Sequence, residues 1–250
     1  MRSSVLALSL LLWPLALQAG EVRYLYEVSW LGLRAGKIEL RVREGEGFRR
    51  LEARSRTVGM ARLVFPFESR WVTWCDASGY PRRSRLYRRR GKKEVVKFFV
   101  FDQRRGVVWR VKVKKGRRKL GRYRLSHHPV YDELSGFVAC TARSWTRPGE
   151  RTVVWIYAHK RAAPAEIVFR GWDRVEAPWG RVRAAKLEVR FGFESELVKR
   201  ARRALLWVHR GIVLRAEGEL PFGHLTVKLK EVKDDHAQAQ ADPGRQGPGE

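Results

Sequence analysis

The stretch VRYLYEVSW, residues 22–30, is followed by LGLRAG, residues 31–36, and KIELRVR, residues 37–43. In the two outer segments, apolar side chains recur at every second position, which is typical of a strand with one buried face. The middle segment supplies turn glycines, so the whole stretch predicts a β-hairpin.

The same alternation recurs along most of the remaining chain, in short segments that are mostly bounded by Gly, Pro or Asp. These further candidate strands are residues 49–57, 67–75, 82–90, 94–101, 107–113, 152–158, 166–170, 183–193, 205–210, 212–220 and 225–232. Strands joined in series by short turns favour an antiparallel meander over a sheet built from βαβ units. The sequence therefore predicts a mainly β fold, a strongly curved antiparallel sheet or barrel of roughly ten or more strands, with one short helix packed on it.

That helix is predicted between Asp132 and Arg143, because acidic residues begin the segment and a basic residue ends it, as the helix dipole favours. Residues 59–65 could form one further turn before Pro66. Residues 195–204 fit either a helix or a long hairpin loop, and periodicity does not decide between them.

The amino-terminal segment is typical of a secretory signal. Arg2 precedes a short apolar run, residues 5–17, and small residues follow at Ala19 and Gly20. The run is shorter than the roughly 18 to 20 residues that span a bilayer, which argues against a membrane anchor. We expect residues 1–20 to be a signal peptide, residues 21–232 to be one periplasmic β domain, and residues 233–250 to be a disordered tail.

The composition is strongly basic, with 53 Lys and Arg against 26 Asp and Glu and a net charge of +27. Such a surface attracts polyanions. Charged residues make up 32% of the chain and Asn is absent, which indicates a thermophilic source. Two cysteines, Cys75 and Cys140, could pair in an oxidising compartment or remain as buried free thiols.

The strongest local signals are clusters of cations. As anion-binding candidates we take Arg88, Arg89, Arg90, Lys92, Lys93, Lys114, Lys115, Arg117, Arg118, Arg200 and Arg203. Clustered cations with interleaved tyrosines also suit nucleic acid, but export argues against that partner. The polyanions of an envelope are phospholipid head groups and lipopolysaccharide phosphates. The alternative is a solvated surface of a thermophilic protein.

Aromatic residues on strand faces are the second signal. As ligand-binding candidates we take Tyr24, Tyr26, Trp30, Trp109, Phe191 and Trp207. A barrel of about eight strands either fills its interior with such side chains or leaves room for one apolar ligand. Close packing favours the filled interior.

No segment carries a recognisable catalytic or metal-binding signature. The turn at residues 32–37 is too short for a phosphate-binding loop and lacks its Ser or Thr. His127 and His128 are adjacent, so in an extended segment their rings point in opposite directions. Ser135 is not in a nucleophile elbow. We therefore assign no catalytic residue, no metal ligand and no cofactor.

Several motifs carry a family resemblance over nearly the whole chain after the signal. They are YEVSWLG (26–32) with AG (35–36), DELS (132–135), APWG (177–180) leading to KLE (186–188), GIVLR (211–215) and LPFG (220–223). With these motifs the chain resembles the exported bacterial family known as DUF3108, a domain of unknown function. The resemblance implies a curved antiparallel sheet or barrel in the cell envelope, and no established activity. Two features depart from the family pattern: Glu133 stands where Pro usually follows the Asp, and the excess of Arg and Lys is larger.

Together these observations predict a periplasmic, non-enzymatic envelope protein that binds a lipid or another amphipathic anionic ligand. Its partners would be anionic lipid or lipopolysaccharide, or an envelope protein. Two alternatives stay open. One is an interaction scaffold that docks an envelope protein or an anionic surface without a pocket, and the other is an envelope hydrolase.

Overall fold

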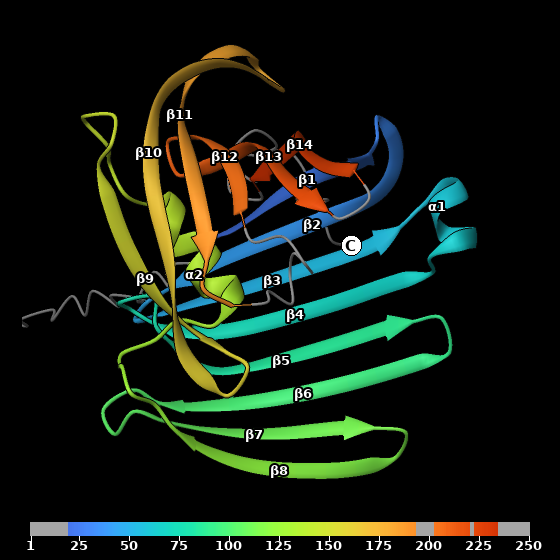
Figure 1. Ribbon diagram of the computed structural model, residues 1–250, viewed down its shortest axis with the longest axis vertical. Helices are drawn as coiled ribbons and strands as arrows, with labels where there is room; N and C mark the ends of the chain where they lie inside the picture. The colour runs from blue at the N-terminus through green and yellow to red at the C-terminus, as the bar shows by residue number, and fades with distance from the viewer. Residues whose placement is uncertain (1–19, 194–202, 221–222, 235–250) are drawn as a thin grey trace, which may run out of the picture.

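The computed structural model describes residues 20–193, 203–220 and 223–234, and these form fourteen strands and two helices (Figure 1). The helices are α1 (Gly59–Val64) and α2 (Glu133–Thr141). The strands are β1 (Glu21–Trp30), β2 (Leu33–Gly45), β3 (Phe48–Thr57), β4 (Phe67–Asp76), β5 (Pro81–Arg90), β6 (Lys93–Asp102), β7 (Val107–Lys114), β8 (Arg117–Arg124), β9 (Arg151–Ala158), β10 (Arg161–Ala177), β11 (Gly180–Phe191), β12 (Arg203–His209), β13 (Ile212–Leu220) and β14 (Gly223–Asp234).

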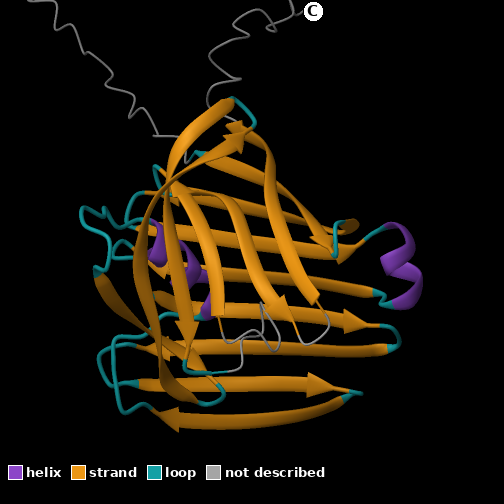
Figure 2. Ribbon diagram, turned by 45° about the horizontal axis from the view of Figure 1, so that its top comes forward, coloured by secondary structure: helices purple, strands orange, loops and turns teal. Residues whose placement is uncertain are grey.

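All fourteen strands belong to one antiparallel sheet in the order β8-β7-β6-β5-β4-β3-β2-β1-β14-β13-β12-β11-β10-β9. The first and last strands pair with each other in the middle of the sheet, so the chain runs outward from there in two meanders. The sheet curves strongly but is not closed, because β8 and β9 form its two edges (Figure 2). The predicted curved antiparallel sheet is confirmed.

Helix α2 connects the two edge strands and packs inside the curve, in contact with β3, β4 and β9. Asp132 caps the helix and also ties it to the sheet. Its carboxylate accepts hydrogen bonds from the Ser135 amide at 2.8 Å, the Trp71 indole at 3.2 Å and the Thr73 hydroxyl at 2.6 Å. The predicted helix, its acidic start and its role as a packed element are therefore all present.

The edge strand β9 is partly covered by the residue before the helix cap. The Tyr131 amide donates to the Trp155 carbonyl at 2.8 Å, and the Tyr157 amide donates to the Tyr131 carbonyl at 2.7 Å. This parallel bridge occupies backbone groups that would otherwise be open to pairing with another chain.

The other edge strand, β8, is missing from the candidate strands of the sequence analysis, where this region contributed only candidate anion-binding cations such as Arg117 and Arg118. Its first four residues, Arg117 to Leu120, are all exposed, so no buried face imposes a period of two. Three of the four are basic, which protects an open edge from pairing with another chain. The same charges that mark a candidate anion site therefore also occupy a sheet edge.

The outer face of the sheet neutralises part of the positive charge through ion pairs within and between strands. Glu52, which is 2% exposed, pairs with Arg50, Arg54 and Arg70 at 2.6 to 2.8 Å. Glu188 similarly accepts from Arg170 on β10 and from its strand neighbour Arg190. Opposite charges on neighbouring strands stabilise a sheet, so these arginines have a structural role.

Other sequence-based expectations have mixed outcomes. The turn expected at residues 59–65 is present as α1, which ends at Val64, and both cysteines are free and buried. Strand β14 ends at Asp234, beyond the expected domain end at residue 232. All but the last residue of the expected signal peptide, nearly all of the expected tail and most of residues 195–204 lie outside the described residues. In the described part of the chain, neither helix has the length and hydropathy needed to cross a membrane.

Candidate functional site

An apolar cavity of about 220 Å³ lies inside the curve of the sheet, between α2 and the inner sides of the strands. Phe137 and Leu134 of α2 form one wall, and apolar side chains from both meanders form the others. Examples from the sheet are Tyr26, Leu40, Phe191, Leu206 and Val227. The period-two pattern of these strands places their apolar residues on this face, so the cavity wall follows directly from the alternation in the sequence.

The volume limits what the cavity can hold. At about 220 Å³ it exceeds the engineered apolar cavity of roughly 150 Å³ that binds benzene. It is smaller than the roughly 300 Å³ at which pockets for drug-sized ligands begin. A single unbranched hydrocarbon segment therefore fits better than a bulky or ring-rich molecule.

One end of the sheet, which we call the α1 rim, carries α1 and the turns β1–β2, β5–β6 and β7–β8 (Figure 1). Cavity-lining Ala204, Gly218 and Leu225 are aligned across β12, β13 and β14, close to this rim. In contrast, Leu134 of α2 packs with Leu51 and Cys75, which lie in the halves of β3 and β4 away from the rim. The helix thus covers the opposite half of the concave face, and the apolar wall extends toward the α1 rim.

Two acidic residues are among those that border the cavity. Glu133, only 6% exposed, borders the cavity from the first turn of α2. Glu217 also lines the cavity, beside Gly218 and therefore nearer the α1 rim, and it pairs with Arg215. Among the described residues, the side chains that line the cavity thus include an acid toward each end and no cation.

The structure brings together two of the six aromatic residues predicted as ligand contacts, because Tyr26 and Phe191 both line the cavity. Tyr24 packs in the adjacent apolar cluster. The Trp30 ring meets Phe65 edge-on, with centroids 6.5 Å apart. Trp109 lies on an exposed position of β7, 38% accessible, and Trp207 lines a different pocket.

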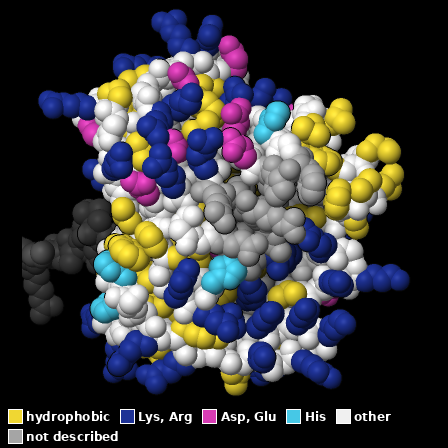
Figure 3. Space-filling model, in the orientation of Figure 1, with side chains coloured by type: hydrophobic (Ala, Val, Ile, Leu, Met, Phe, Trp, Pro, Cys, Tyr) yellow, Lys and Arg dark blue, Asp and Glu magenta, His cyan; other side chains and the backbone are white. Residues whose placement is uncertain are grey.

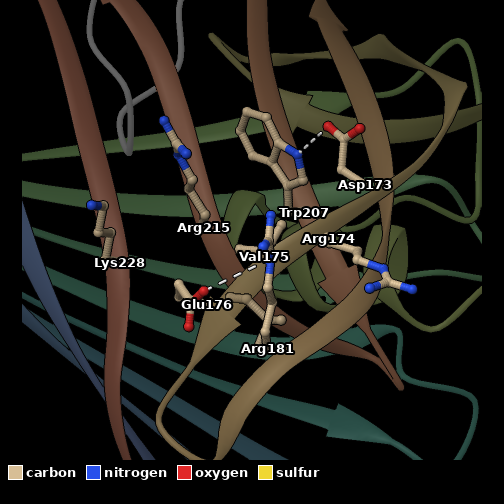
Figure 4. Close-up of a pocket in the computed structure, with 9 residues that line it drawn as sticks. Asp173, Arg174, Val175, Glu176, Arg181, Trp207, Arg215 and Lys228 are labelled. Carbon is tan, nitrogen blue, oxygen red and sulfur yellow. Dashed lines mark hydrogen bonds and ion pairs between the residues drawn. The ribbon is translucent and has the colours of Figure 1, made fainter.

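That second pocket, of about 480 Å³, lies beside the β10–β11 hairpin, near β12 to β14 (Figure 4). The Trp207 indole donates to Asp173 at 2.8 Å, and the Arg215 guanidinium lies 4.9 Å from the ring centroid. The indole bond, with Lys186 and Arg215 nearby, holds the pKa of Asp173 below its usual value despite some desolvation. Arg174 and Lys228 line the pocket without an ion-pair partner among the described residues.

The predicted anion-binding cations gather mainly at the α1 rim, on β5 and in the turns β5–β6 and β7–β8. Within the described ranges, seven of them have no ion-pair partner: Arg90, Lys92, Lys93, Lys114, Lys115, Arg117 and Arg118. Arg89 pairs with Glu68 at 2.8 Å, and Arg203 pairs with Glu219 at 2.7 Å. Arg200 lies outside the described residues. Ion pairs therefore neutralise part of the positive charge on the outer face, whereas these two turns carry cations without an ion-pair partner among the described residues.

Groups that suggested chemistry in the sequence have structural contacts. The Ser135 hydroxyl accepts from the Asp132 amide at 3.1 Å and donates to the Asp132 carboxylate at 2.8 Å, which completes a capping box. His127 stacks on Trp155, with ring centroids 3.8 Å apart. Among the residues that the structure describes, no three His, Cys, Asp or Glu side chains are placed to hold a metal ion.

Comparison with known proteins identifies the relatives of this chain. Residues 25–230 match the family described as "Protein of unknown function (DUF3108)". No curated protein matches the sequence. A β-barrel-like protein of the DUF1849 family from Brucella abortus is similar in structure, with a TM-score of 0.56 and 12% identity, and the match covers 86% of this chain and 98% of that one. That likeness shows the fold alone.

A second similar structure is a putative exported protein with a YmcC-like fold from Bacteroides fragilis, at 12% identity, covering 85% of this chain and 95% of that one. Its TM-score of 0.34 is too low to support an argument.

Proposed function

The chain belongs to the DUF3108 family of unknown function, and from this premise we propose that it is a non-enzymatic cell-envelope protein that binds an amphipathic anionic ligand. The hydrocarbon part of the ligand would occupy the apolar cavity, and its anionic head group would lie toward the basic α1 rim. The amino-terminal segment, which is typical of a secretory signal, supports an envelope location.

The observation that carries the proposal is the unfilled apolar space beneath α2. Close packing is the rule in protein interiors, and this sheet has many large side chains available. Even so, the walls of the cavity include five small residues: Ala53, Ala165, Ala204, Ala216 and Gly218. An unfilled volume costs stability in proportion to its size, so a space of about 220 Å³ is more readily explained by a ligand than by folding.

The test is native mass spectrometry of the full chain purified from its envelope fraction, with extraction and analysis of any retained molecule. The wild-type protein is expected to carry an unbranched acyl chain or a similar amphiphile. In Ala216→Leu, three added carbon atoms occupy the cavity, and retention should fall while the midpoint of thermal unfolding stays the same or rises, because filling a cavity stabilises.

The matched control is Ala142→Leu, which makes the same change at an exposed position after α2. This variant should retain ligand like the wild type. If the wild type carries no amphiphile and Ala216→Leu unfolds at a lower temperature, the cavity is not a ligand site, and the scaffold alternative is favoured.

A further inference from the structure

The α1 rim exposes an unusual group of large apolar side chains. Met60 and Leu63 are 74% and 75% exposed, and α1 has no buried residue at all. The full group is Leu31, Leu33, Met60, Leu63, Val64 and Phe65. Because these side chains contribute little to the core, folding does not explain their hydrophobicity, and exposed apolar patches mark interaction sites.

These residues form one continuous surface that the fold holds in place. The Trp30 ring contacts Phe65, which joins the β1–β2 turn to the segment after α1. The Thr57 hydroxyl donates to the Phe65 carbonyl and accepts from the Phe67 amide, both at 3.0 Å. A six-residue helix is marginal in water by itself, so these bonds at its ends are needed to keep its apolar side chains presented.

The unpaired cations lie directly beside this surface. The Gly91 amide of the β5–β6 turn donates to the Pro66 carbonyl at 2.9 Å, which fixes the basic turn against the end of α1. The β7–β8 turn is two strands further along the sheet, which corresponds to about 10 Å. Figure 3 shows the apolar side chains around α1 and the Lys and Arg side chains over the neighbouring strands on the same side of the molecule.

We propose that the α1 rim docks on an anionic lipid bilayer, with α1 and the β1–β2 turn inserted among the head groups and the two basic turns against the lipid phosphates. Apolar side chains that insert at the interface and cations that meet anionic lipids add to each other in peripheral membrane binding. This deepens the proposed function, and rests on it in one respect: docking by this rim would place the end of the cavity near Ala204, Gly218 and Leu225 toward the source of an amphiphile.

Co-sedimentation with vesicles tests the docking. The full chain is mixed with vesicles of phosphatidylcholine alone or with added phosphatidylglycerol, at low and high salt. Wild-type protein should bind the anionic vesicles, and salt should weaken that binding without abolishing it, because screening acts on the charges but not on the inserted side chains.

Two variants separate the apolar and basic parts of the surface. Met60→Ser with Leu63→Ser should lower the partition coefficient about tenfold or more. Replacing Lys114 and Lys115 by Gln should lower it roughly fivefold per charge. The matched controls are Trp179→Ser and the pair Arg104→Gln with Arg105→Gln, which alter exposed residues in the β10–β11 and β6–β7 turns at the opposite end of the sheet.

The proposal is overturned if the chain does not bind anionic vesicles, or if the control variants weaken binding as much as the rim variants, since binding would then follow net charge alone. All side chains substituted in the rim and control variants are exposed, and unchanged circular dichroism verifies folding. Measuring retained amphiphile as well as vesicle binding distinguishes a failure of the docking proposal from a failure of the proposed ligand binding. Ala216→Leu should still bind vesicles, and the Met60 and Leu63 double variant should still carry amphiphile when purified with it.

Discussion

The buried carboxylate of Asp132 holds the helix that forms one wall of the cavity, and its removal is the most decisive test of the fold. Asp132 is 2% exposed and accepts four hydrogen bonds. Two come from Ser135 within the helix, and one each from Trp71 and Thr73 on β4. Replacing Asp132 by Ala breaks the helix cap and the link to the sheet together.

The expected cost follows from these contacts. Loss of an N-cap costs about 1 kcal/mol. The Trp71 indole N–H and the Thr73 hydroxyl are left buried without their acceptor, at about 1 to 3 kcal/mol each. We expect Asp132→Ala to lose about 4 kcal/mol of the free energy of unfolding, a large fraction of the roughly 5 to 15 kcal/mol typical of a folded domain.

Urea unfolding followed by tryptophan fluorescence measures this loss. Asp132→Asn keeps the oxygen that caps the helix but presents an N–H₂ group, which cannot accept a hydrogen bond from the Trp71 indole. Its loss in the free energy of unfolding should therefore be about half that of Asp132→Ala. Ser135→Ala removes only part of the capping box and should cost about 1 kcal/mol. If Asp132→Ala costs no more than Ser135→Ala, the bonds to β4 do not hold the helix, and our account of the cavity wall is wrong.

Three further predictions concern the thiols, an ion-pair cluster and the second pocket. Burial raises the pKa of both Cys75 and Cys140 to about 12, so at pH 8 iodoacetamide should label them only after unfolding, and rapid labelling of the native protein would contradict their burial. Burial of Glu52 acts to raise its pKa, but the hydrogen bonds from Arg70 and Arg54 outweigh it and hold the pKa below the ordinary 4.5. The carboxylate therefore stabilises the fold above that value, and Glu52→Gln should cost about 1 to 3 kcal/mol at pH 7. This deficit should shrink as the pH falls through the lowered pKa, and a deficit independent of pH would exclude the ionised pair as its cause. Trp207→Phe removes the indole donor to Asp173, so the Asp173 pKa, followed by NMR, should rise toward its usual value, and an unchanged pKa would show that the indole bond does not set it.

The sequence by itself determined most of the strands, their faces and the cap of α2. Alternation with a period of two and turn glycines act between residues close in the chain, so they could be read directly for the hairpin at residues 21–45. The DELS segment, residues 132–135, likewise predicts where α2 begins, because the capping contacts join residues that are close in the chain. Strand β8 was missed because a charged edge strand has no buried face to impose that period.

Only the tertiary structure decided where those faces meet. The pairing of β1 with β14 joins residues from the two ends of the chain, and Tyr26 and Phe191 come to one cavity from strands on opposite sides of that pairing. It also decided which cations remain unpaired. Arg70 pairs with Glu52 on the neighbouring strand, whereas Lys92 in the β5–β6 turn and Lys93 at the start of β6 have no acidic partner among the described residues. Neither outcome is visible in a linear pattern, because cavity volume and charge neutralisation depend on contacts between residues far apart in the sequence.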